Sequence, residues 1–94
     1  MFEATLSENG DVLLSGRFDA SKVDIATNVF GKIGASCTVN FKDLEYISSA
    51  GLSVLLVTQK RLRGAGHGLK LINMNKHIRD VFRYAGFDTV FEIE

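Results

Sequence analysis

The chain has 94 residues, 46% of them hydrophobic and 23% charged, a composition typical of one globular domain spanning residues 1–94. Eleven basic and eleven acidic residues cancel to a formal net charge of zero, so the positive field of a nonspecific nucleic-acid or membrane binder is absent. We therefore expect no direct nucleic-acid binding. We also expect no membrane insertion and no signal peptide, because the apolar runs are short and residues 1–15 lack basic side chains. These features predict a cytoplasmic protein.

The first half of the chain is predicted to begin with a β-hairpin. Asn9-Gly10 separates two short apolar-polar segments, and Asn-Gly is a strong hairpin-turn signal. A helical spacing of apolar residues follows, and then a segment rich in β-branched residues that Lys42-Asp43 interrupts. The expected elements are strands at 2–7 and 11–18, a helix at 21–33 and strand segments at 36–41 and 44–47.

The second half is predicted to contain the central helix. Its leucines recur at spacings of three and four, and Val54 and Val57 widen the apolar stripe, which indicates burial over much of the helix circumference. Glycines after residue 63 end this helix, and Asn75 is suited to cap the next one. The expected elements are helices at 51–63 and 76–85 and strands at 68–74 and 89–93.

These elements have the order ββαβαβαβ, which predicts an α/β domain with a mixed sheet of about five strands and helices packed against it. Cys37 is the only cysteine, so no intramolecular disulfide can form, and we expect a buried thiol. Two histidines ten positions apart, with no nearby carboxylates around them, do not make a metal-ligand cluster. We expect no metal and no cofactor.

Two serines, Ser48 and Ser49, lie where a strand turns into the central helix. A serine at this junction is well suited to cap the helix, because its hydroxyl accepts a hydrogen bond from an otherwise unpaired amide. Capping accounts for one of the two hydroxyls. The helix start also carries a partial positive charge and free amides, so a phosphate can be held there without a basic side chain.

A serine at a strand-to-helix turn is also a feature of hydrolases with the pattern G-x-S-x-G. Here Ile47 takes the place of the first glycine, and a β-branched residue resists the strained backbone of such a turn. His67 falls in a Gly-rich turn and His77 in the first turn of the next helix, so neither is an evident base for the serine. We expect no enzyme activity and no catalytic residues.

The basic run KRLR at residues 60–63 suits either an acidic partner or RNA, but it also falls in the last turn of a helix. Cations there complement the helix dipole and are usually solvated. Gly64 to Gly68 (GAGHG) lacks the strand before and helix after that a dinucleotide-binding loop needs. We interpret both features as structural.

The segment NFKDLEYISSAGLSVLLVTQKRLRGAGHGLKLINMNKHIRDVFRYAGFDTVFEI, together with GRFDAS at 16–21, resembles the STAS domain family of bacterial anti-sigma factor antagonists. The resemblance implies a switch serine at Ser49, with Ser48, at a position often occupied by aspartate, as the second choice. It implies that the unphosphorylated domain binds an anti-sigma factor that is also a serine-protein kinase, and that phosphorylation ends this binding. The implied partner-binding residues are Asp19, Ser21, Lys22, Ser48, Ser49, Ala50 and Gly51.

Two alternatives stay open at this stage. In the first, the domain is a non-switching STAS subunit or scaffold of a transport or stress-signalling complex, and the serines only cap the helix. In the second, ranked lowest, it is an enzyme or a nucleotide-binding protein. Many family members continue into a C-terminal helix where this sequence stops, so we expect exposed apolar surface that a homodimer or another subunit covers.

Overall fold

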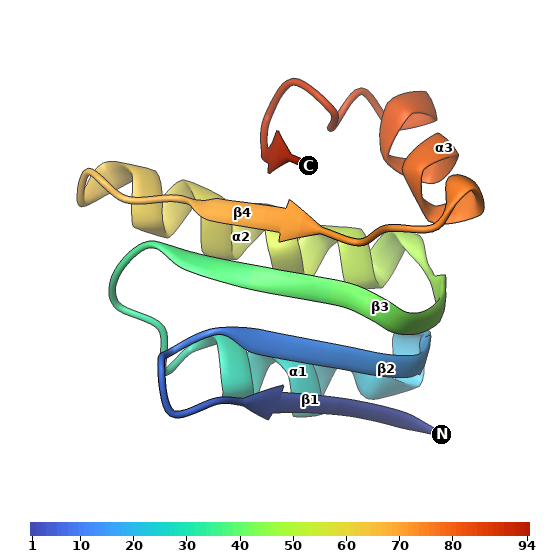
Figure 1. Cartoon of the computed structure of the whole chain (residues 1–94), viewed down its shortest axis with the longest axis horizontal. Helices are drawn as coiled ribbons and strands as arrows, with labels where there is room; N and C mark the ends of the chain where they lie inside the picture. The colour runs from blue at the N-terminus through green and yellow to red at the C-terminus, as the bar shows by residue number, and fades with distance from the viewer.

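The chain forms one five-stranded sheet, and the computed structural model describes all residues 1–94 (Figure 1). The strands lie in the order β1-β2-β3-β4-β5. Their bounds are Phe2–Leu6 for β1, Val12–Phe18 for β2, Cys37–Ile47 for β3, Leu69–Ile72 for β4 and Glu92–Ile93 for β5. β1 pairs with β2 antiparallel and the other three pairs are parallel. The predicted mixed sheet and element order are confirmed.

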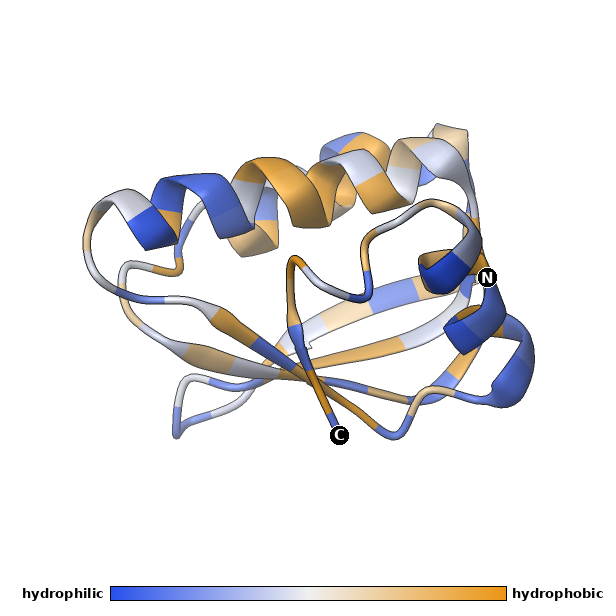
Figure 2. Cartoon of the chain, turned by 90° about the horizontal axis from the view of Figure 1, so that it is seen from above, coloured by the Kyte–Doolittle hydropathy of each residue, from blue (hydrophilic) through white to orange (hydrophobic).

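The helical segments are η1 (Ala20–Lys22), α1 (Val23–Phe30), α2 (Ser49–Gly64) and α3 (Lys76–Tyr84). α1 and α2 lie side by side over one face of the sheet, as Figure 2 shows. Because β2, β3 and β4 are parallel, the helical segments that follow them start at the edge where these strands end, which we call the carboxyl edge. The opposite edge is called the amino edge. None of the helices combines the length and apolarity needed to cross a lipid bilayer.

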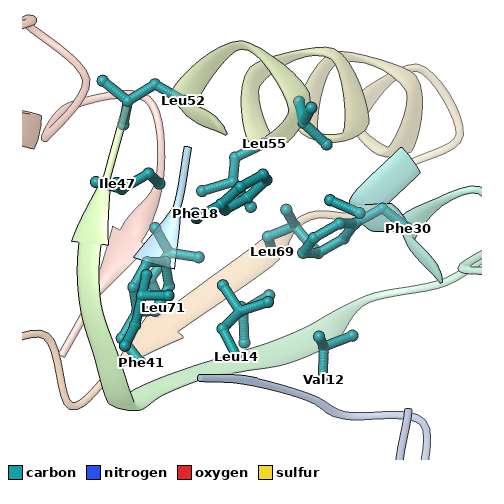
Figure 3. Close-up of a cluster of buried hydrophobic side chains, with 14 of the residues drawn as sticks. Val12, Leu14, Phe18, Phe30, Phe41, Ile47, Leu52, Leu55, Leu69 and Leu71 are labelled. Carbon is teal, nitrogen blue, oxygen red and sulfur yellow. The ribbon is translucent and has the colours of Figure 1, made fainter. Parts of the chain in front are cut away.

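The core lies between the sheet and the helix layer (Figure 3). Leu55 of α2 and Leu14 of β2 are fully buried, as alternation along the strand and the helical spacing of the leucines predict. Phe82 of α3 makes edge-to-face contacts with Phe41 and Phe91, at centroid distances of 5.9 and 5.8 Å, which fixes α3 against the sheet. The single thiol, Cys37, is buried as expected.

Several predicted boundaries differ from the structure: β4 spans Leu69–Ile72 rather than 68–74, and α1 spans Val23–Phe30 rather than 21–33. Lys42-Asp43 does not interrupt β3, which is continuous from Cys37 to Ile47; the register against β2 shifts there instead, as in a β-bulge. The last strand has two residues rather than five, because a turn occupies the positions before it.

The face of the sheet away from the helices carries mainly polar side chains. Lys70 on this face forms ion pairs with Glu94 at 2.7 Å and Glu92 at 3.9 Å. Arg17 stacks on the Tyr46 ring, with its guanidinium carbon 4.4 Å from the ring centroid. The uncovered sheet face is therefore mainly polar, with Leu13 exposed on it. The covering of apolar surface by a homodimer or another subunit stays a prediction.

Candidate functional site

Ser48 is the N-cap of α2. Its backbone is extended, with φ −87° and ψ 169°, and its Oγ accepts a hydrogen bond from the Gly51 amide at 3.1 Å. The Ser48 amide donates to the carbonyl of Phe18 at 2.9 Å, which ties the turn to the end of β2. The Ser48 hydroxyl therefore has a structural role at the start of the helix.

Ser49, the first residue of α2, differs from its neighbour. Its side chain is exposed, and its hydroxyl makes no hydrogen bond within the protein. Its carbonyl accepts a hydrogen bond from the Ser53 hydroxyl at 3.1 Å. The amides of Ser49 and Ala50 are the first two of the helix, so they have no intrahelical acceptor. The exposed hydroxyl thus sits beside free amides at the positive end of the helix dipole.

Gly51 sets how closely α2 approaches the sheet. The residue is buried, and a Cβ there would lie 2.9 Å from Ile47 Cγ1 and 3.1 Å from Phe18 Cγ. Both of these neighbours belong to strand ends and point under the first turn of α2, as Figure 3 shows for the labelled side chains. Gly51 therefore contributes the shape of the turn rather than exposed surface.

Asp19 lies directly after Phe18, so it is next to the Ser48 turn. Its carboxylate caps η1 by accepting hydrogen bonds from the amide and the hydroxyl of Ser21, at 3.0 and 2.6 Å. These bonds, mainly the one from the hydroxyl, lower the pKa of Asp19, and the positive charges of Lys22 and Arg17 add to the effect. Asp19 is therefore a carboxylate at neutral pH.

The structure brings the residues named from the resemblance to one edge. η1 packs against α2, so Ser21 and Lys22 lie at the carboxyl edge with the two serines. The start of α3 reaches the same edge in Figure 1, where Asn75 caps the helix by accepting from the Ile78 amide at 2.8 Å, as predicted. Three capped helical starts thus lie at the carboxyl edge.

One exposed apolar residue near this edge was missed from the sequence. Val57 was expected to widen the buried stripe of α2, but its exposed fraction is 66%. The prediction is wrong because only the sides of α2 towards the sheet and α1 are covered, whereas Val57 lies on the outer side, which faces solvent. Ser49, Ser53 and Val57 follow one another at a spacing of four, so they share the outer face of α2. This spacing, which groups Val57 with two polar residues, was the sequence signal that Val57 is exposed.

Neither histidine hydrogen-bonds with the two serines. His67 follows the C-terminus of α2, at the amino edge, and its Nδ1 lies 3.5 Å from Ser36 Oγ. His77 is exposed in the first turn of α3. Nucleophilic catalysis by serine needs a base within hydrogen-bond reach. The Ser49 hydroxyl is therefore accessible for covalent modification by another enzyme. Neither histidine is placed to act as a base that would make it a nucleophile.

The fold is shared with solved anti-sigma factor antagonists. The structure of one from Mycobacterium paratuberculosis superposes with a TM-score of 0.82, at 19% identity, over 99% of this chain and 83% of that one. SpoIIAA, a Bacillus cell fate determinant solved in its phosphorylated form, gives a TM-score of 0.71 at 18% identity, over 100% of this chain and 91% of that one. At these identities the comparison shows the fold alone.

Sequence comparison identifies the family. A family model described as "Mlab, STAS domain" matches residues 3–93, so the chain belongs to the STAS domain family. The anti-sigma-B factor antagonist of Bacillus subtilis is 32% identical over 60 residues, which are 64% of this chain and 55% of that protein. BtrV of Bordetella bronchiseptica, described as a candidate anti-sigma factor antagonist, is 44% identical over 50 residues, 53% of this chain and 43% of that protein. The chain thus matches about half the length of each.

Proposed function

We propose that this chain is an anti-sigma factor antagonist that acts in the cytoplasm through the surface around the start of α2. In this proposal the unphosphorylated domain binds an anti-sigma factor that is also a serine-protein kinase, and phosphorylation of Ser49 ends the binding. The binding residues are Asp19, Ser21, Lys22, Ser48, Ser49 and Ala50, with Gly51 shaping the turn beneath them. The names of the relatives support the class of function.

The observation that carries the proposal is the contrast between the two serines. The Ser48 hydroxyl is engaged in the helix cap, whereas the Ser49 hydroxyl is exposed and makes no hydrogen bond within the protein. A phosphate on Ser49 adds about −1.5 to −2 charges to the surface at neutral pH. The free amides at the helix start favour that charge, so the domain stays folded while a partner that fits the neutral surface is repelled.

The first test is phosphorylation by a partner kinase of the anti-sigma type, with ATP, followed by intact-mass spectrometry. We expect one added phosphate on the parent chain and none on Ser49→Ala. Ser48→Asn removes the neighbouring hydroxyl but keeps a good N-cap, and Ser53→Ala removes the exposed hydroxyl one turn away. Both controls should still accept one phosphate. A phosphate that persists in Ser49→Ala but disappears in Ser48→Asn would reassign the switch to Ser48.

The second test separates a switch from a static subunit. In a non-switching STAS subunit of a transport or stress-signalling complex, the serines only cap the helix, and the Ser48 hydrogen bond to Gly51 is the observation that favours this candidate. We expect Ser49→Asp to weaken binding to the anti-sigma partner, measured by isothermal titration calorimetry, relative to Ser53→Asp. Unchanged affinity in Ser49→Asp would support the static subunit. The homodimer stays a prediction, which sedimentation equilibrium can test.

A further inference from the structure

A hollow of about 650 Å³ lies at the amino edge, at the other end of α2 from Ser49. It is formed by the C-terminal part of α2, the starts of β3 and β4 and the segment that leads into β5. Small-molecule sites have volumes of about 300–1,000 Å³. Most of the lining residues are polar, and they include three that can carry positive charge: Arg63, His67 and Lys70.

Two of these three basic residues have no acidic partner. Arg63 has no ion pair, and its single contact is a 3.4 Å hydrogen bond from Nη1 to the carbonyl of Val90. The His67 ring contacts Ser36 through Nδ1, while its Nε2 makes no hydrogen bond within the protein. Lys70, in contrast, is paired with Glu92 and Glu94. Unpaired donors of this type, above all the planar fork of arginine, bind phosphate and carboxylate oxygens.

The hollow also holds two carboxylates and one thiol, and none of them forms an ion pair or a hydrogen bond with Arg63. Asp11 accepts a hydrogen bond from the Thr38 amide at 3.1 Å, and Glu92 lies 3.9 Å from Lys70. Burial raises the pKa of the Cys37 thiol to about 11, so it is neutral at physiological pH. The carboxylates keep their negative charge, but neither of them pairs with Arg63, so the Arg63 guanidinium is free to bind a ligand.

The wall of the hollow is held by Gln59, which is buried. Its Nε2 donates to the carbonyl of Val90 at 2.8 Å, and its Oε1 accepts from the Leu69 amide at 2.7 Å. This side chain bridges β4 and the segment before the short β5, where no strand pairing closes the gap. These hydrogen bonds hold two segments of the wall of the hollow in fixed positions.

We propose that this hollow binds a small multivalent anion through Arg63 and His67. The ligand class is a molecule with two or more phosphate or carboxylate groups, since one arginine fork and one imidazole together suit several acidic oxygens. Lys70 sits at the far side of the hollow with its own carboxylate partners. The site lies at the opposite edge from the Ser49 surface, so it does not depend on the proposed function.

The test is an NMR titration of the full ¹⁵N-labelled chain with inorganic pyrophosphate and, separately, with citrate, both at constant ionic strength. We expect saturable shifts of the amides around Gly68 with at least one of these anions. Arg63→Gln should weaken the affinity by about tenfold, the loss expected for one charge-assisted hydrogen bond. Lys60→Gln is the matched control. Lys60 is a cation at the same end of α2, but its side chain does not line the hollow. The affinity of this variant should stay within twofold of the parent chain.

Pyrophosphate binding alone identifies a phosphorylated ligand, and citrate binding alone identifies a polycarboxylate. Three results would overturn the proposal: shifts that do not saturate with either anion, equal weakening by Arg63→Gln and Lys60→Gln, or binding of a single-stranded oligonucleotide with no binding of either small anion. Because Arg63 is exposed, we expect Arg63→Gln to fold, and its amide spectrum checks this directly.

Discussion

The two ends of helix α2 differ in how closely they are packed. At the first turn, Gly51 leaves no space for a Cβ between Ile47 and Phe18, whereas a Cβ on Gly64 at the last turn would meet nothing within 4 Å. The Ser48 hydroxyl is used in the cap at the first turn, whereas Arg63 at the other end has no ion pair. The N-terminal end of α2 is therefore tightly packed and exposes the Ser49 hydroxyl. The C-terminal end is loosely packed and carries basic side chains.

This difference is the physical basis for proposing a modification at one end and a small ligand at the other. A group added to Ser49 projects from a tightly packed turn, so it changes the surface without disturbing the packing below. Cations at the C-terminal end of α2 complement the negative end of the helix dipole, and one of them, Arg63, has no ion pair and keeps donors free for a bound anion.

The largest effect is expected for Gly51→Ala. The new methyl group would overlap Ile47 and Phe18, and overpacking of this kind costs about 1–3 kcal/mol. Gly64→Ala at the open end is the control, and its stability should be unchanged or raised by up to about 1 kcal/mol. Urea denaturation monitored by circular dichroism measures both. Equal stability of the two variants would contradict the close packing of the first turn.

The next effect concerns Arg61, which fixes the end of α1. Its guanidinium donates to the carbonyls of Ile33 at 2.7 Å and Phe30 at 2.9 Å. Arg61→Gln should lower the free energy of unfolding by about 1–2 kcal/mol, because these carbonyls at the helix end lose charged donors. Lys60→Gln, one residue earlier, should change it by less than about 0.5 kcal/mol. If the two variants unfold at the same urea concentration, the bonds from Arg61 are not stabilising.

A smaller difference should separate the two serines. Ser48→Ala removes the cap of α2 and should cost about 1 kcal/mol. Ser49→Ala removes an exposed hydroxyl without a protein partner and should stay within about 0.5 kcal/mol of the parent. Thermal unfolding of both variants gives the comparison. A larger loss in Ser49→Ala would show that its hydroxyl is structural.

The smallest effect is a shift in the titration of Asp19, followed by NMR. Hydrogen bonds from Ser21 hold the pKa of Asp19 below its usual value of 3.8. Because the folded-state pKa is lowered, the carboxylate stabilises the fold above the unfolded-state pKa, and this contribution is lost as the pH falls through the folded-state pKa. Ser21→Ala should raise the Asp19 midpoint towards the usual value, while Ser53→Ala leaves it unchanged. No change in Ser21→Ala would mean that the hydroxyl does not set this pKa.

Much of the fold could be predicted because the relevant signals are local. The Asn9-Gly10 turn, the spacing of the leucines in α2 and the cap at Asn75 each involve a few neighbouring residues. Features that depend on distant partners were missed. Val57 is exposed because nothing covers the outer side of α2, and β5 is short because a turn occupies the residues before it, where Gln59 bonds to the Val90 carbonyl.

In the candidate site, too, features set by local signals could be predicted and features set by distant residues could not. Parallel strands end at a common edge, so the order of the elements was sufficient to bring Asp19 and the two serines together. The close approach at Gly51 was not predictable, since it depends on Phe18, which lies 33 positions earlier in the chain.

The sequence by itself determined the element order, the mixed sheet and the junction at which two serines precede the central helix. These depend on periodicity, capping and turn residues, which act over a few positions. Only the tertiary structure decided which serine is used as the cap, because the Ser48 amide is held by the carbonyl of Phe18, far away in the chain, and this places Ser48 just before the first turn of α2 and leaves the Ser49 hydroxyl exposed. It also decided that Arg63 and His67 meet at one hollow, since that hollow is formed by segments far apart in the chain.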